Sequence, residues 1–341
     1  MDRDLMHSEL TGARSELKPG ESWCAWSLLP WPGASSGSAA AELLEVKSEL
    51  QNVYTRLEAM ADVQHDMSRG SCDNNQLSGE LSVNISMLSN LEDLVVSNNN
   101  FTGSIPSKIG NLKKLKRLDL SRNHLIGPIP TSLWNLKNLI HVYLFNNNLV
   151  NISSLSNLEK FSVISNNFTG QIPRDFGKNS PNLSIVVFTN NSFFGEFPQG
   201  LCSGFNLEYL SVNNNSFTGP LPECLRNCTK LKRVRFDGNR FTGNITNAFG
   251  VHPHLDSIFL NNNQFIGHVS SMWGQCQNLT TLQMGHNKIA GKIPSELGNL
   301  MKLQVLNLES NKLNGPIPNQ LVNLKLLYLN LSNNHLTKKS L

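Results

Sequence analysis

From residue 67 onward, apolar residues recur at fixed positions of a repeated sequence pattern, here called the phrase, of about 24 residues. One clean copy reads LEDLVVSNNNFTGSIP over residues 91–106. Counted from the first apolar residue as position 0, apolar positions 3 and 5 flank an outward position 4, the alternation of a strand with one buried face. The pattern predicts one short strand per copy, stacked in a parallel sheet. The copies start at Met67, Leu91, Leu115, Leu139, Leu158, Leu183, Leu207, Leu231, Leu255, Leu279, Leu303 and Leu326.

Three other positions of the phrase carry particular residues. Position 8 is Asn in every copy, from Asn75 to Asn334, and its amide has donors and an acceptor for the backbone groups of a tight turn. Position 12 is Gly in ten copies, which suits a turn with positive φ; Asn151 and Lys338 stand in the other two. Position 10 predicts a stacked aromatic column in the core, made of Phe168, Phe193, Phe217, Phe241 and Phe265.

The fourth copy is the irregular one. It is only 19 residues long and lacks the Gly-x-Ile-Pro segment, so we expect a local irregularity there on the convex side. The phrase as a whole is identified as a leucine-rich repeat, and twelve copies make a chance match implausible. We therefore expect an α/β repeat fold, a right-handed solenoid with a concave parallel β-sheet over residues 67–341.

The Ile-Pro pair that follows the glycine narrows the type of repeat. It occurs, for example, at Ile105-Pro106, Ile129-Pro130 and Ile293-Pro294. These repeats resemble the extracellular repeats of plant receptor-like kinases and receptor-like proteins. The resemblance implies a secreted ectodomain with a cysteine-paired cap, followed by a membrane span and a cytoplasmic kinase. It places the protein at the plasma membrane, facing outward.

The first 66 residues differ from the rest. They hold 5 Lys or Arg against 11 Asp or Glu, whereas residues 67–341 hold 24 against 14. Residues 1–40 are expected to be irregular, because residues 20–40 are rich in Trp, Pro, Gly and Ser. Residues 41–66 contain apolar residues at alternating spacings of 3 and 4, which predict a short heptad helix. It either pairs with a partner helix or folds over the first repeat as a cap.

Both ends depart from the receptor pattern. No signal peptide is readable at Met1, and no apolar run reaches the roughly 20 residues of a membrane span. No cap is evident at either end, and the last copy breaks off in mid-repeat at Leu341. We therefore expect a fragment or a truncated gene product of a receptor ectodomain, with a cytosolic location as the alternative.

The cysteines and the glycosylation motifs bear on the compartment. Cys228 and Cys276 share position 21 with leucines of other copies and are expected to be buried. Cys202 and Cys224 lie one coil apart, close enough for a disulfide in an oxidising compartment. Candidate glycosylation sites, several of them by-products of the repeat itself, are Asn84, Asn100, Asn151, Asn167, Asn182, Asn190, Asn214, Asn227, Asn244, Asn278 and Asn330.

Catalytic and nucleotide-binding motifs are missing from the sequence. It has no phosphate-binding loop, kinase signature, nucleophile elbow or His-Glu-x-x-His helix. Its nine His and six Cys show no metal-ligand spacing, so we expect neither a metal nor a cofactor. A net charge of +4 without a basic run argues against nucleic-acid binding. We expect a recognition protein, not an enzyme.

One copy carries a candidate binding site on the concave face. Arg233 and Arg235 occupy outward positions 2 and 4 of the same strand and match an R-x-R motif by which some plant receptor kinases of this type hold the C-terminal carboxylate of a peptide hormone. Alternatively, Asp237 and Asp256 pair with the arginines in a solvated surface network of little energetic value. The rest of the groove is expected from Tyr209, Ser211, Asn213, Ser257, Phe259 and Asn261.

Our interpretation is therefore a peptide-binding receptor ectodomain in defence or development. The resemblance implies a peptide or protein ligand on the concave face and a co-receptor. Two alternatives stay open: a secreted inhibitor of a polysaccharide-degrading enzyme, and a cytosolic interaction scaffold.

Overall fold

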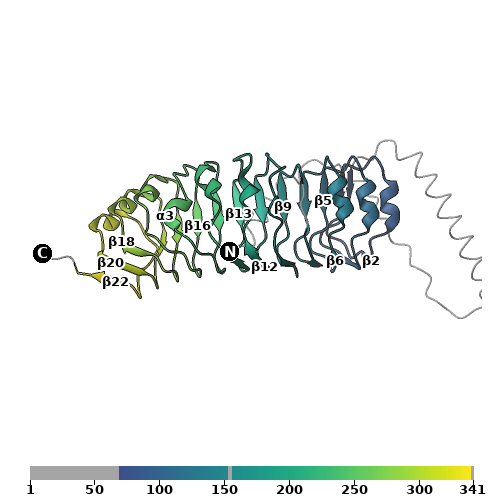
Figure 1. Ribbon diagram of the computed structural model, residues 1–341. Coiled ribbons are helices and arrows are strands. Elements are labelled where there is room, and N and C mark those ends of the chain that lie inside the picture. Colours follow the sequence, from purple (N-terminus) through teal and green to yellow (C-terminus); the bar gives the residue numbers. More distant parts are fainter. Residues whose placement is uncertain (1–68, 153–155, 339–341) are drawn as a thin grey trace, which may run out of the picture.

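A computed structural model describes residues 69–152 and 156–338. Each copy of the phrase forms one coil of a solenoid, and the coils follow one another along a single axis (Figure 1). Every coil contributes one strand of three residues to a parallel sheet whose strand order follows the chain. The strands are β1 (Arg69–Ser71), β3 (Asp93–Val95), β5 (Arg117–Asp119), β7 (His141–Tyr143), β9 (Lys160–Ser162), β11 (Ile185–Val187), β13 (Tyr209–Ser211), β15 (Arg233–Arg235), β16 (Ser257–Phe259), β17 (Thr281–Gln283), β19 (Val305–Asn307) and β21 (Tyr328–Asn330).

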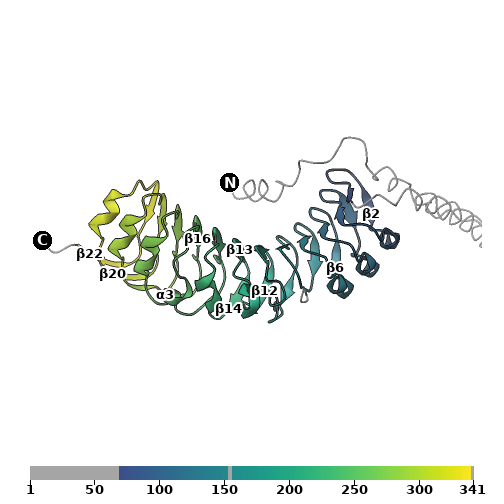
Figure 2. The same cartoon turned by 90° about the horizontal axis from the view of Figure 1, so that it is seen from above.

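Shorter strands and single helical turns complete the coils. Figure 2 shows the solenoid as an arch, with the long sheet on its inner side and the helical turns on its outer side. The short strands are β2 (Ser78–Glu80), β4 (Asn100–Thr102), β6 (Ile126–Pro128), β8 (Asn148–Val150), β10 (Thr169–Gly170), β12 (Ser192–Glu196), β14 (Ser216–Thr218), β18 (Ala290–Lys292), β20 (Lys312–Pro316) and β22 (His335–Thr337). The helical turns are η3 (Val83–Met87), η4 (Ser107–Asn111), η5 (Thr131–Asn135), η6 (Gln199–Cys202), η7 (Glu223–Asn227), η8 (Ser271–Gln275), η9 (Ser295–Asn299), η10 (Asn319–Asn323) and α3 (Ile245–Ala248).

The Ile-Pro pair explains where the outer helical turns begin. Ile105 is buried in the core, and Pro106 is the residue directly before η4, with φ of −67°. Proline fixes φ near this value and has no N–H, so it ends the preceding strand and starts a helical turn without losing a hydrogen bond. Pro130, Pro294 and Pro318 occupy the same place before their helical turns.

The position-8 asparagines join successive coils, as the sequence predicts. Asn123 Nδ2 donates to the carbonyl oxygens of Val96, one coil earlier, and of Leu120, in its own coil, at 3.1 and 3.2 Å. Its Oδ1 accepts a hydrogen bond from the N–H of Phe101 at 3.0 Å. The same arrangement recurs along the solenoid. Backbone groups that the sheet leaves unpaired are therefore satisfied by side chains of the next coil.

The glycine and phenylalanine predictions are also confirmed. All ten position-12 glycines have positive φ, between 69° and 99°, and Asn151 at this position has φ of 56°. The five position-10 rings are buried and stack in sequence with centroid distances of 5.7 to 6.1 Å. This column belongs to the core, since each ring packs against the ring of the coil before and the coil after it.

The short fourth copy interrupts the secondary layers, although the long sheet continues through it. β7 pairs with β9 in register, His141 opposite Lys160. By contrast, the short sheet of β6 and β8 ends there, and β10 begins a separate one. The expected convex-side irregularity falls partly on residues 153–155, which lie outside the described residues. So do residues 1–66, with the irregular segment and the heptad helix expected there.

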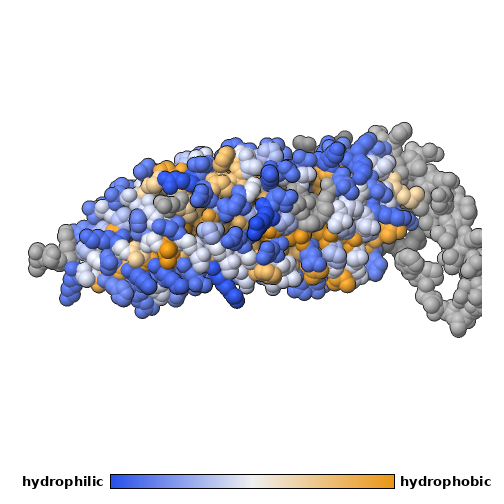
Figure 3. Space-filling model, viewed as in Figure 1, coloured by the Kyte–Doolittle hydropathy of each residue, from blue (hydrophilic) through white to orange (hydrophobic). Residues whose placement is uncertain are grey.

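The surface is mixed in character. In Figure 3, hydrophilic residues cover most of the visible face, and apolar residues form bands between them. Within residues 69–152 and 156–338, no helix is long and apolar enough to cross a membrane.

Candidate ligand-binding face

Strand β15 presents two arginines to the concave side. Arg233 and Arg235 flank Val234, whose side chain is fully buried, so both guanidinium groups leave the sheet on the same face. Residues two apart in a strand are about 7 Å from each other. The sequence prediction of two neighbouring guanidinium groups therefore agrees with the strand geometry.

Neighbouring side chains orient both arginines. Arg235 donates from Nε and Nη2 to the two carboxylate oxygens of Asp237, at 3.1 and 3.0 Å, a bidentate contact. The guanidinium carbons of Arg233 and Arg235 lie 5.6 and 4.9 Å from the centroid of the Phe259 ring. A ring face and a carboxylate together limit the rotation of these side chains. The site is thus preorganised.

The alternative, a surface network in which Asp237 and Asp256 pair with the two arginines, is observed only in part. Asp237 does pair with Arg235, and the side chains of Arg235 and Asp237 are only 20% and 11% exposed, respectively. Asp256 instead accepts hydrogen bonds from the hydroxyl groups of Ser257 and Thr280, at 2.6 and 2.8 Å. The Arg235–Asp237 contact is therefore better shielded from water than an ordinary surface ion pair.

The other predicted groove residues lie around the two arginines. Tyr209 and Ser257 are the register partners of Arg233, one on each side, and Ser211 and Phe259 are those of Arg235. The structure therefore brings these residues together. Asn213 also lies on this face, where its Oδ1 accepts a hydrogen bond from the hydroxyl of Thr189 at 2.7 Å.

Lys232 adds a contact that we did not anticipate. Its Nζ lies 5.7 Å from the centroid of the Tyr209 ring and forms an ion pair of 2.7 Å with Glu208. Lys232 is therefore paired with a residue of the coil before its own, and its ammonium group lies over the Tyr209 ring.

A second polar group lies on the concave face of β5, β7 and β9. Arg117 contacts Asp119 through Nη2 at 3.3 Å and lies 5.6 Å from the centroid of the Tyr143 ring. Burial raises the pKa of Tyr143 to about 12. This ring therefore stays neutral and packs beneath the guanidinium group. We did not single out these residues, although the outward positions 2 and 4, compared across copies, contain them.

His141 is the middle residue of this second group. Its Nε2 lies 3.4 Å from Glu159 Oε2 but makes no hydrogen bond of acceptable geometry. Burial lowers the pKa of His141, and Lys160 lowers it further, while Glu159 acts in the opposite direction. Because burial has the largest effect, we regard the imidazole as neutral near pH 7 and the Glu159 contact as weak.

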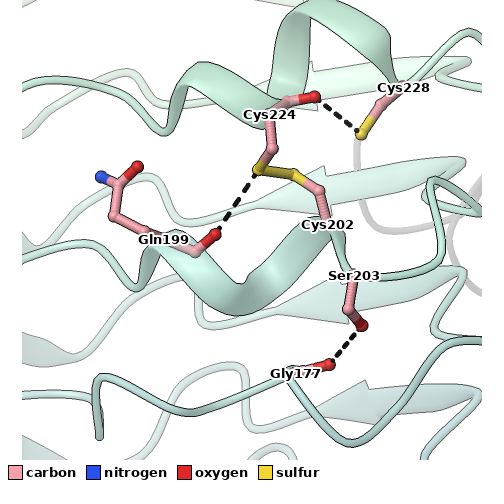
Figure 4. The surroundings of a disulfide bond; sticks show 6 residues. All are labelled: Gly177, Gln199, Cys202, Ser203, Cys224 and Cys228. Carbon is pink, nitrogen blue, oxygen red and sulfur yellow. Dashed lines mark hydrogen bonds between the residues drawn. A yellow bond between two sulfur atoms is a disulfide. The ribbon is translucent and has the colours of Figure 1, made fainter.

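The described cysteines are either disulfide-bonded, as Cys72, Cys202 and Cys224 are, or reduced. Cys202 in the helical turn η6 and Cys224 in η7 form a disulfide between neighbouring coils, with Cα atoms 5.8 Å apart (Figure 4). Cys228 and Cys276 are reduced and fully buried, as their position predicts. Between these two coils, at the same position 21, lies His252, also fully buried, with Nδ1 3.1 Å from the carbonyl oxygen of Cys228.

The candidate glycosylation sites differ in exposure. Asn278 and Asn330 are half-buried; the latter donates from Nδ2 to Glu309 at 2.6 Å and lies on the concave strand β21. The others are exposed: Asn84, Asn100, Asn151, Asn167, Asn182, Asn190, Asn214, Asn227 and Asn244. Glycosylation itself stays a prediction. Among the residues that the structure describes, no cluster of three or more His, Cys, Asp or Glu is suited to a metal ion.

Comparison with known families agrees with the coil geometry. Residues 89–149 and 253–313 match the family described as Leucine rich repeat, and residues 206–228 match a second family of that description. The chain is a leucine-rich-repeat protein. A comparison of this leucine-rich-repeat protein with curated proteins gives no match.

Solved structures similar to this leucine-rich-repeat protein include plant receptor ectodomains. That of GASSHO1/SCHENGEN3 from Arabidopsis thaliana, in complex with CASPARIAN STRIP INTEGRITY FACTOR 2, is 34% identical with a TM-score of 0.72, over 77% of this chain and 32% of that one. The PEPR1–AtPEP1 complex is 30% identical with a TM-score of 0.69, over 79% and 42%. Arabidopsis HAESA with the peptide hormone IDA and the co-receptor SERK1 is 31% identical with a TM-score of 0.61, over 79% and 54%.

The chain thus spans about a third to a half of the length of these three structures. Its repeats are built like those of a plant receptor-kinase ectodomain, as the Ile-Pro pairs predict.

Proposed function

We propose that the concave face binds an extended peptide and that Arg233 and Arg235 hold the C-terminal carboxylate of that peptide. The observation that carries the proposal is the pair of guanidinium groups on one strand, oriented by Asp237 and stacked on Phe259. Two guanidinium groups on one face can donate several charge-assisted hydrogen bonds to one carboxylate. The apolar area of Tyr209 and Phe259 suits the last side chain of such a peptide.

The receptor context is part of the proposal. The similar ectodomains were solved as complexes with peptide ligands, and one of them also with a co-receptor. We propose that this chain has the corresponding role at the outer face of the plasma membrane, in recognition rather than in catalysis. Recruitment of a co-receptor would follow ligand binding.

Two matched peptide libraries test the proposal. One contains randomised decapeptides with a free C-terminal carboxylate, and the other contains the same sequences as C-terminal amides. Loss of a charge-assisted contact costs about 1.5–3 kcal/mol, so we expect the double variant Arg233→Ala/Arg235→Ala to bind free-carboxylate peptides about 10- to 100-fold more weakly. Arg174→Ala, which removes an exposed arginine elsewhere, is the control.

Amidation is the decisive comparison. The wild-type chain should retain peptides with a free carboxylate and not their amides, measured by isothermal titration of the retained sequences. Equal affinity for the two forms would refute carboxylate binding at β15.

A further inference from the structure

The polar group on β5, β7 and β9 forms an ordered row. His141 is the register partner of Arg117 on one side and of Lys160 on the other. Adjacent strands are about 4.8 Å apart, so three nitrogen-bearing side chains lie next to one another at outward position 2. Lys160 is half-buried, and the Arg117 and His141 side chains are each 26% exposed. This basic row is therefore accessible from the concave side.

The row contains polar atoms that lack hydrogen-bond partners. Arg117 Nε and His141 Nε2 are buried and make no hydrogen bond in the described structure, and neither does Ser162 Oγ, which lies outside the row at position 4 of β9 and is 0% exposed. A guanidinium, a neutral imidazole in one tautomer and a hydroxyl can all donate a proton. Buried donors without acceptors are costly. The two unpaired nitrogens of the row, in side chains that are 26% exposed, suit a ligand group that accepts hydrogen bonds.

Three acidic side chains lie next to the row: Asp93, the register partner of Arg117 on β3, together with Asp119 and Glu159. Asp119 Oδ1 accepts hydrogen bonds from the N–H and hydroxyl of Ser121, at 3.2 and 2.7 Å. Its contact with Arg117 is longer, at 3.3 Å, and Glu159 lies 3.4 Å from His141 without a hydrogen bond. A ligand carboxylate at His141 and Lys160 would therefore compete only with these two long contacts of Asp119 and Glu159.

The face between the basic row and β15 has a different character. The outward residues of β11, Ile185 and Val187, are apolar and buried, and those of β13 are Tyr209 and Ser211. Beyond β15, the outward positions 2 and 4 of β16, β17, β19 and β21 carry no Lys, Arg or His. The uncharged outward positions of β11 and β13 therefore lie between two basic groups, the row on β5, β7 and β9 and the arginine pair on β15. On the other side of β15, outward positions 2 and 4 carry no basic residue.

We propose that the basic row Arg117, His141 and Lys160 is a second anchoring subsite, which binds an acidic side chain of the same extended peptide. The inference rests on the proposed function for the position of the C-terminus. From the centre of the row on β7 to β15 there are four strand steps, or about 19 Å. An extended chain covers about 3.3 Å per residue, so the Asp or Glu stands about six residues before the C-terminus. The residues between them are uncharged.

The libraries described above, retained on the full chain and read by mass spectrometry, test this subsite. The variant is Arg117→Gln/Lys160→Gln, which keeps polar side chains of similar length. Its control is Lys137→Gln, which neutralises an exposed lysine in the same copy as Arg117. On the wild type and the control we expect Asp and Glu to be enriched about six residues before the C-terminus. On the variant this enrichment disappears, and peptides selected on the wild type bind about tenfold more weakly or worse.

The outcomes separate the subsite from the proposed function. Loss of acidic enrichment in the variant, with the free carboxylate still required, supports both. Unchanged enrichment in the variant, or no positional preference on the wild type, overturns the subsite and leaves carboxylate binding standing. If amidated peptides bind equally but the acidic preference still requires Arg117 and Lys160, the subsite stands and the spacing rule falls. Retention of neither library overturns both proposals.

Discussion

The asparagine of the eighth copy offers a quantitative test of how the coils are held together. Asn239 is buried, and its Nδ2 donates to the carbonyl oxygens of Val212, Phe236 and Asp237 at 3.0, 3.1 and 3.3 Å. Its Oδ1 accepts the hydrogen bond of the Phe217 N–H at 3.1 Å. Asn239→Ala removes all four hydrogen bonds, of which those with Val212 and Phe217 join this coil to the one before it.

The substitution affects the partners of Nδ2 less than the partner of Oδ1. Each of the three carbonyl oxygens keeps another donor: Asn215 Nδ2, Asn263 Nδ2 and the N–H of Asn214. The N–H of Phe217 loses its only described acceptor in a fully buried setting. An unsatisfied buried N–H costs about 1–3 kcal/mol, so we expect a loss of about 2 kcal/mol at this interface.

Amide hydrogen exchange measures this loss where it occurs. A decrease of about 2 kcal/mol in the local opening free energy corresponds to roughly 30-fold faster exchange of the Phe217 amide, when exchange is limited by opening. Exchange of segments several coils away should change much less, because each coil contacts only its neighbours.

Asn75→Ala is the matched control. It changes the same position of the phrase, but no N–H within residues 69–152 and 156–338 donates to Asn75 Oδ1, and its Nδ2 donates only to Cys72 and Asp73. We expect a smaller effect on exchange there. Equal effects of the two substitutions, or an unchanged rate at Phe217, would refute the claim that the orphaned N–H determines the loss.

Three further substitutions test the core, the buried histidine and the disulfide. Phe217→Ala removes the central ring of the stacked column and should lower the free energy of unfolding by about 3–5 kcal/mol in urea titrations; a loss below 1 kcal/mol would contradict the packing seen here. Burial lowers the pKa of His252 from 6.5, so the folded chain binds fewer protons than the unfolded chain and loses stability as pH falls below about 6.5. His252→Gln should therefore reduce the difference in stability between pH 7 and pH 5, and an identical difference would exclude this residue as a source. Cys202→Ser/Cys224→Ser opens a loop with a sequence separation of 22 and should cost about 3 kcal/mol. Reductant should destabilise the wild type more than the variant, which keeps the disulfide of Cys72.

The periodic part of this fold was open to prediction from sequence. Every coil has the same tight turn, the same unpaired backbone groups and the same buried face. The roles of the asparagine amide, the positive-φ glycine and the stacked rings therefore follow from their positions in the repeat. The side-by-side orientation of Arg233 and Arg235 follows from strand alternation for the same reason.

Features that depend on side-chain rotamers were harder to predict. The stacking of Arg233 and Arg235 on Phe259 and the bidentate hold of Asp237 depend on side-chain rotamers, which a repeat pattern does not specify. The burial of His252 had a usable signal, since it shares position 21 with Cys228 and Cys276. The basic row had a signal too, but only when outward residues are compared across copies instead of along each strand.

The stacking of coils against nearest neighbours alone also determines how the molecule responds to force. When the ends of such a solenoid are pulled apart, coils should detach one after another, since each coil of residues 69–152 and 156–338 stacks on its nearest neighbours. Each detached coil of about 24 residues releases roughly 80 Å of extended chain. The disulfide between Cys202 and Cys224 withholds the residues between them from this extension. A pulled molecule should therefore lengthen in near-equal steps with one shortened step in its middle, which disappears under reducing conditions.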